Sequence, residues 1–214
     1  ESRRGRQFEQ GEPATGSYPS AFRTEAVSVQ RTDLLVTPDN AQSQLVATID
    51  GADDAIDVVQ PTVGDWDDPL LRALRRAAAR GVEVRLLLSD AWYVREENEQ
   101  TAQRFQEWAE RNDAPLTAKV ADPDGRYEKI HAKGAVVDDE RVVVGSLNWN
   151  EQAATANREV VLVLHGSDAA DYFGAVFAAD WEGGGFDTPV GVLVALLGLL
   201  VVAGLAARRV SFEG

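Results

Sequence analysis

Short apolar runs alternate with helix-forming segments along most of this 214-residue chain, and this alternation constrains the fold more than any other feature. Residues 55–60 are predicted to form a buried strand. Asp68 and Pro69 then supply a helix N-cap and a first helical position, and Gly81 ends that helix. Residues 82–88 are the next predicted strand. Such alternation predicts an α/β fold with helices on both faces of a mixed sheet.

The same signals place the remaining elements. Further strands are predicted at residues 34–36, 116–121, 130–137, 142–144 and 160–164. Further helices are predicted at residues 37–50, 97–112 and 167–181. Thr37 is the expected N-cap of the first of these, with Pro38 as its first residue. No internal repeat is present in the sequence, so residues 25–185 are predicted to form one α-β-α sandwich lobe.

A run of polar residues at fixed spacing begins in the predicted hairpin of residues 130–144 and continues just beyond it. It fits the pattern HxK(x)4D(x)6GSxN at every fixed position, with the polar side chains of His131, Lys133, Asp138, Ser146 and Asn148. Residues two apart on a strand project to one face, so His131 and Lys133 are expected side by side. A buried return strand and Gly145 are expected to bring Ser146 and Asn148 back beside them.

These residue types suit the chemistry of a phosphodiester. The substrate is anionic, so its site needs fixed positive charge and hydrogen-bond donors around the phosphoryl oxygens. Lys133 supplies an ammonium, Asn148 an amide and Ser146 a hydroxyl. His131 is the plausible nucleophile, because imidazole titrates near pH 6.5 and is partly neutral at pH 7. A neutral imidazole can attack phosphorus, and a protonated one can donate to the leaving oxygen.

The motif resembles the signature of the phospholipase D superfamily, the HKD enzymes. The resemblance spans about residues 25–183 and implies metal-free cleavage or exchange of a phosphodiester through a phosphohistidine. It also implies that Glu159 bonds the second ring nitrogen of His131 and fixes its tautomer. In the family, the residue that matches Asp138 is structural rather than a direct participant. The predicted catalytic set is His131, Lys133, Asp138 and Glu159; Lys133, Ser146 and Asn148 hold the phosphate, and no metal or cofactor is expected.

The chain carries one such motif, whereas these enzymes normally build one active site from two. Its other histidine, His165, has no lysine two residues later and is expected at a strand end. The second motif is expected from a homodimer mate or from a missing first lobe of a longer chain. Residues 1–24 have the composition of a flexible linker, rich in Arg, Glu, Gly, Pro and Ser, which favours the second alternative.

A second strong signal is the uncharged run of nineteen residues at 189–207. At about 1.5 Å per residue it can cross a hydrocarbon core roughly 30 Å thick. Residues 186–188 are then a joint, and 208–214 a tail that begins with Arg208 and Arg209. Basic residues after a span indicate a cytoplasmic C-terminus. We therefore expect a single-pass transmembrane helix in the cell membrane, with the catalytic lobe outside the cytoplasm.

The charge of the chain indicates both a habitat and a substrate. The net charge is −14, and only three of the 21 basic residues are lysines, which is typical of proteins held in concentrated salt. An acidic surface argues against DNA, since nucleic-acid binding normally needs a basic surface. The expected substrate is therefore a phospholipid, as in phospholipases D and cardiolipin synthases.

Three further hypotheses remain open. The chain can be an anchored extracellular endonuclease of the same superfamily, or a lobe that is inactive without a partner lobe. Separately, Trp66, Trp92 and Tyr93 lie in loops after predicted strands, where packing at the lobe edge is favoured over a place at the substrate entrance. The sequence does not decide which head group is used, nor whether water or an alcohol accepts the phosphoryl group.

Overall fold

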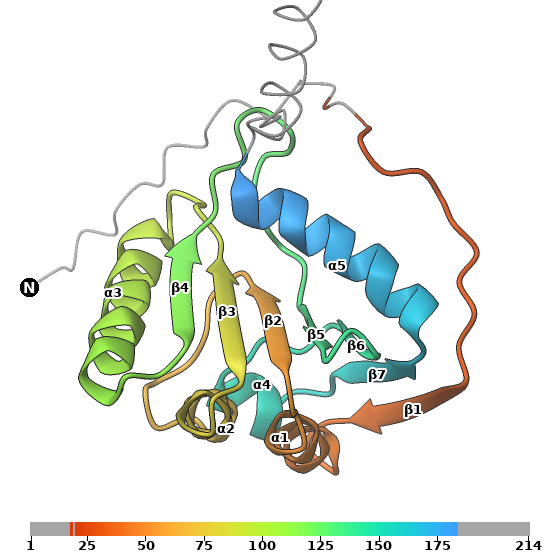
Figure 1. The fold of residues 1–214 in the computed structure, drawn as a ribbon, viewed down its shortest axis with the longest axis horizontal. Helices are drawn as coiled ribbons and strands as arrows, with labels where there is room; N and C mark the ends of the chain where they lie inside the picture. The colour runs from red at the N-terminus through yellow and green to blue at the C-terminus, as the bar shows by residue number, and fades with distance from the viewer. Residues whose placement is uncertain (1–17, 19, 184–214) are drawn as a thin grey trace, which may run out of the picture. The chain divides into compact units, whose positions relative to one another are not determined.

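The computed structural model describes residue 18 and residues 20–183, which form one α/β lobe (Figure 1). Its strands are β1 (Arg31–Val36), β2 (Ala55–Gln60), β3 (Glu83–Leu88), β4 (Leu116–Val120), β5 (Gly134–Val137), β6 (Arg141–Gly145) and β7 (Val160–His165). Its helices are α1 (Ala41–Asp50), α2 (Pro69–Ala79), α3 (Arg95–Asn112), α4 (Glu151–Thr155) and α5 (Ser167–Glu182).

The strands form one seven-stranded sheet in the order β1-β7-β6-β5-β2-β3-β4. Strands β2, β3 and β4 are parallel, and every other neighbouring pair is antiparallel. The sheet is therefore mixed, as predicted. The two halves meet where β5 lies antiparallel to β2, with Val59 opposite Gly134.

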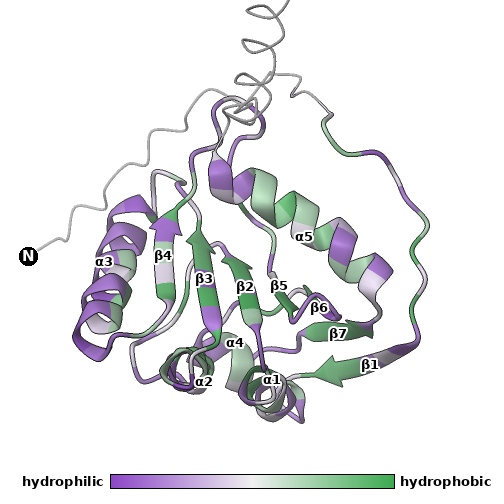
Figure 2. Ribbon diagram, viewed as in Figure 1, coloured by the Kyte–Doolittle hydropathy of each residue, from purple (hydrophilic) through white to green (hydrophobic). Residues whose placement is uncertain are grey.

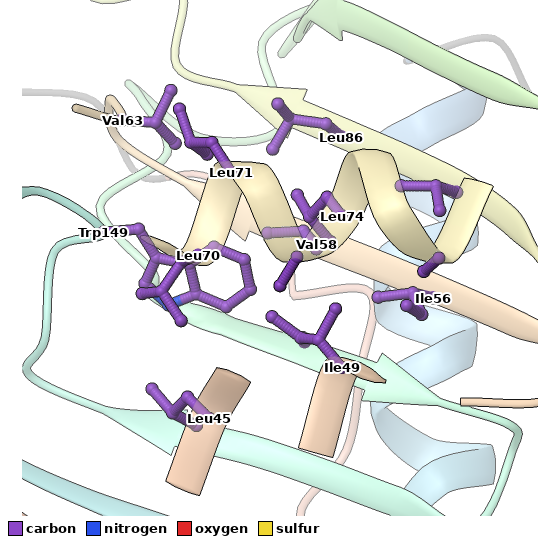
Figure 3. Close-up of a cluster of buried hydrophobic side chains, with 14 of the residues drawn as sticks. Leu45, Ile49, Ile56, Val58, Val63, Leu70, Leu71, Leu74, Leu86 and Trp149 are labelled. Carbon is purple, nitrogen blue, oxygen red and sulfur yellow. The ribbon is translucent and has the colours of Figure 1, made fainter. Parts of the chain in front are cut away.

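Helices cover both faces of this sheet, which confirms the predicted sandwich. Helix α5 crosses one face over β5 and β6, whereas α1 and α2 pack together on the other (Figure 1). The larger core lies between the sheet and α1 and α2. Figure 3 shows its side chains: Leu45, Ile49, Ile56, Val58, Val63, Leu70, Leu71, Leu74, Leu86 and Trp149. The central strands consist mainly of hydrophobic residues, whereas α3 consists mainly of hydrophilic ones (Figure 2).

Local signals account for α2 in detail. The Asp68 carboxylate accepts a hydrogen bond of 2.9 Å from the backbone amide of Leu70, and Pro69 opens the helix. Leu70, Leu71 and Leu74 are fully buried on one face. The helix ends before Gly81, which has a positive φ of 98°. The predicted helix and its cap are confirmed.

The strand predicted at residues 130–137 begins only at Gly134, so residues 130–133 are irregular. Strand β2 ends at Gln60, and Pro61 has no amide hydrogen with which to continue a ladder. Residues 130–133 therefore have no partner strand on that side. The prediction that alternation along a strand would place His131 beside Lys133 is wrong.

The helix predicted from Pro38 begins at Ala41. Thr37 is fully buried instead of capping it, and its hydroxyl donates to the carbonyl of Asn157 at 2.8 Å. Helix α4 was not predicted, although Asn150 is an N-cap signal and its side chain accepts from the amide of Ala153 at 2.9 Å. At five residues, α4 is too short to show apolar periodicity.

None of the helices in the described part of the chain is long and apolar enough to span a bilayer. The span predicted at residues 189–207, the joint at 186–188 and the tail at 208–214 lie outside the described residues. So do residues 1–17 and residue 19 of the predicted linker.

Candidate active site

His131 and Lys133 lie on the irregular segment that enters β5, at the end of the sheet where β2 stops. The His131 side chain is exposed and that of Lys133 is half-buried. The Lys133 ammonium donates to the His131 carbonyl, with an Nζ to O distance of 2.9 Å. The two residues are therefore held together by a local backbone contact rather than by strand alternation.

Ser146 directly follows β6, and Glu159 directly precedes β7. The two residues therefore meet at the same end of the sheet. The Ser146 amide donates to the Val160 carbonyl at 3.0 Å, and the Ser146 hydroxyl donates to the Glu159 carboxylate at 2.5 Å. A Cβ on Gly145 would lie 2.2 Å from the Val160 carbonyl oxygen, so this approach requires glycine. The Asn157 amide binds the second carboxylate oxygen at 3.1 Å. Glu159 is therefore fixed from both sides.

Thr37 is a positioning residue that the sequence analysis missed. Its hydroxyl accepts from the Glu159 amide at 2.8 Å, and its own amide donates to the Glu159 carbonyl at 3.1 Å. The end of β1 thereby fixes the backbone that carries the carboxylate. A threonine just after a short apolar strand is a weak signal by itself, and Pro38 made a helix cap the stronger interpretation.

The hydrogen bond expected between Glu159 and His131 is not formed within the described residues. Both oxygens of the carboxylate accept from other side chains, those of Ser146 and Asn157. Its charge still reaches Lys133: burial lowers the pKa of Lys133, and the negative charge of Glu159 opposes that shift. In this structure Glu159 acts on the site through Ser146 and Lys133.

Asp138 lies at the opposite end of β5 from His131. Its carboxylate accepts from the amides of Asp54 at 2.8 Å and Ala55 at 3.1 Å, and it pairs with Arg141. The structure thus does not bring Asp138 into the candidate active site, and its contacts support the structural role rather than the catalytic one. His165 ends β7, as predicted, and its Nε2 lies 2.9 Å from the Asp33 carboxylate.

A cavity of about 460 Å³ adjoins His131 and Lys133 between α5 and the sheet, and we call it the α5 cavity. Most of its walls are apolar side chains: Val59, Val136, Val142 and Val144 from the sheet, and Phe173, Val176 and Phe177 from α5. Residues 129–133 also line it, and of these His131 is exposed and Lys133 is half-buried. Asn148 lies half-buried after β6, at the same end of the sheet as Ser146. Within the described residues, no group of three or more His, Cys, Asp or Glu side chains is arranged to hold a metal ion.

We expect His131 to titrate below the ordinary imidazole pKa of about 6.5. The positive charge of Lys133 is the main cause of this lowered pKa, followed by burial and by Lys129. A Lys133→Met variant should therefore raise the pKa of His131, and Lys129→Met should raise it less. The chain has two histidines, so proton NMR can follow both, with His165 as the internal reference. An unchanged His131 midpoint in Lys133→Met would contradict this account.

A mixed sheet between helices, with an HxK segment and a GSxN segment at one end, defines a phospholipase D-like lobe. Solved structures support this class at the level of the fold. NucT from Helicobacter pylori has a TM-score of 0.60 at 21% identity, over 72% of this chain and 96% of NucT. Phosphatidylserine synthase from Haemophilus influenzae Rd KW20 has a TM-score of 0.56 at 15% identity, over 82% of this chain and 46% of the synthase.

The family whose description is "Cardiolipin synthase, PLD-like domain" matches residues 45–181, which is more than half of the chain. The chain belongs to this family. It is also similar to mitochondrial cardiolipin hydrolase from Mus musculus, with 40% identity over 53 residues. That match covers 25% of this chain and 24% of the mouse protein, so the chain spans about a quarter of the length of this relative.

Proposed function

We propose that this chain is a phosphodiesterase or phosphatidyltransferase that acts on phospholipid head groups. Members of the superfamily are phosphodiesterases or phosphatidyltransferases, which supports the reaction class. The observation that carries the lipid assignment is the contact between the candidate phosphate site and the α5 cavity. A phosphodiester bound at His131 and Lys133 would lie beside mostly apolar walls, which suits a lipid better than a polynucleotide.

The proposed reaction has two displacements. Neutral His131 attacks phosphorus, a P–N bond forms, and the P–O bond to the head-group alcohol breaks. The leaving oxygen takes a proton from a general acid. Water or a second alcohol then attacks phosphorus and loses its proton to the deprotonated general acid, and the P–N bond breaks to restore the imidazole. Lys133 and Asn148 hold the phosphoryl oxygens throughout, where the ammonium and the amide donors stabilise the added negative charge. Ser146 joins them when its hydroxyl proton, which Glu159 accepts in this structure, turns to the phosphate.

The general acid is proposed to be a histidine from a second HKD motif. The sequence holds one such motif, so the second comes from a homodimer mate or from a partner lobe. The proposed location is the cell membrane, where the run at residues 189–207 would anchor the lobe on the outer side. The net charge of −14 supports a lipid over DNA, since polyanions bind basic surfaces.

The full chain is expected to release head groups from phospholipid vesicles in high salt with a chelator present, and to leave DNA intact. The measurement is head-group release from vesicles of phosphatidylglycerol and cardiolipin, with single- and double-stranded DNA as parallel substrates. Loss of activity per molecule on dilution would indicate that two copies form the site. Cleavage of DNA without lipid turnover would instead support the endonuclease. A folded chain inert toward both would favour a lobe that needs a partner.

A further inference from the structure

We propose that the α5 cavity binds one acyl chain of the phospholipid whose phosphate lies at His131 and Lys133. This inference rests on the proposed function and assigns a second subsite to it. The cavity volume of about 460 Å³ falls within the range of roughly 300–1,000 Å³ that is typical of small-ligand pockets. Three side chains of α5, Phe173, Val176 and Phe177, face four valines of the sheet across it.

The cavity and the candidate phosphate site are continuous. His131 and Lys133 both line the cavity, and His131 is itself exposed. One ligand can therefore place an anionic phosphate against Lys133 and an attached apolar chain between α5 and the sheet. Burial of that chain would be favourable in proportion to its length.

The charged groups of the cavity wall do not compete for this role. Asp57 and Asp180 line it, and each is paired with an arginine outside the lining. The Asp57 carboxylate lies 2.6 Å from Arg85, and that of Asp180 lies 3.1 Å from Arg126. Each carboxylate thus has a cationic partner, although burial outweighs that partner and raises the pKa of both. The arginines occupy the positions that a cationic ligand would take, and the valine and phenylalanine walls are left to select an apolar one.

The surface beside the cavity also suits a lipid. The side chains of Trp92 and Tyr93 are 75% and 52% exposed, and their rings contact each other edge to face at 5.5 Å. The Lys129 ammonium lies 5.3 Å from the Tyr93 ring, and Lys129 lines the cavity. Exposed Trp and Tyr with a neighbouring cation are typical of a membrane–water interface. The expectation that these two aromatics are packed at the lobe edge is wrong.

Binding of alkyl phosphates to the full chain tests the acyl subsite without requiring turnover. We expect octyl phosphate to bind at least about tenfold more tightly than butyl phosphate, because each buried methylene contributes up to about fourfold. The Val176→Phe variant adds a ring to the cavity wall and should bring the ratio of the butyl phosphate to the octyl phosphate dissociation constant close to one. The matched control Ala175→Phe adds the same ring on the exposed side of α5 and should keep the ratio. Isothermal titration calorimetry measures the six dissociation constants, two for each of the three proteins.

Three results would overturn the proposal: equal binding of both alkyl phosphates, an unchanged ratio in Val176→Phe, or thymidine 5′-monophosphate bound as tightly as octyl phosphate and lost in Val176→Phe. If Val176→Phe does not fold, Val176→Leu must still reduce the ratio. A chain that binds octyl phosphate as predicted yet releases no head groups would retain the subsite while showing that this chain alone lacks the proposed activity.

Discussion

Replacing His131 with alanine is expected to reduce phosphodiester hydrolysis by at least about 10⁴-fold, as loss of a covalent nucleophile does in other enzymes. The neighbouring Lys133, Ser146 and Asn148 would remain, and phosphate binding with them. His131 is exposed, so its removal should change the free energy of unfolding by no more than about 0.5 kcal/mol. A loss of activity without a loss of stability would identify His131 as the nucleophile or as the general acid.

The chain supplies its own control, because His165→Ala removes the other histidine. His165 lies at the far end of β7 against Asp33, so this variant should keep full activity. Rapid quenching in base followed by mass spectrometry should detect the phosphoryl adduct on the peptide that contains His131. Comparable activity in His131→Ala and His165→Ala, or an adduct on another residue, would exclude the phosphohistidine mechanism proposed for this lobe.

The Asp138→Asn variant is expected to lower the free energy of unfolding by about 2–3 kcal/mol. The Asp138 side chain is 9% exposed. Its carboxylate accepts hydrogen bonds from three backbone amides and forms a salt bridge with Arg141. Asparagine keeps one acceptor oxygen and tolerates the φ of 54°, so the change removes mainly the charge. Thermal unfolding should shift down by about 5–10 °C.

Asp139→Asn is the matched control, because Asp139 is exposed and has a similar φ of 52°. Burial alone would raise the pKa of Asp138, but the three amides and Arg141 outweigh it and hold that pKa below its ordinary value. The stabilisation is therefore present above about pH 4 and is lost as the pH falls towards the folded pKa. Denaturant unfolding at pH 6 and pH 3 measures this. An equal loss of free energy of unfolding in Asp138→Asn and Asp139→Asn at pH 6 would refute the stabilising role assigned to the Asp138 carboxylate.

Elements with both local and tertiary support could be predicted from the sequence. Helix α2 has a capping side chain, a proline at its first position and an apolar face that packs on the sheet, so each signal predicts the same helix. The N-terminal limit of β5 could not be predicted in this way. It depends on where β2 ends, and β2 lies more than seventy residues earlier in the sequence, with Val59 opposite Gly134.

The members of the candidate active site could be predicted better than their contacts. Spacing alone indicates that His131, Lys133 and Ser146 share one end of the sheet. It contains no information on Thr37, whose role arises only when β1 lies beside β7. For the same reason the sequence did not predict which side chain Glu159 binds. In the structure Ser146, rather than His131, donates to the Glu159 carboxylate across the β6–β7 pair, and this contact depends on strand register.

The pairing of β1 with β7 has a consequence for the newly made chain. It joins Arg31 to His165, so the first strand of the lobe completes its edge of the sheet only after the last strand has been synthesised. Contacts between residues so far apart in sequence form slowly. A ribosome-bound chain therefore carries His131 before Thr37 can fix the backbone of Glu159. The imidazole of His131 is in this way kept without its complete set of neighbouring side chains until synthesis of the lobe is finished.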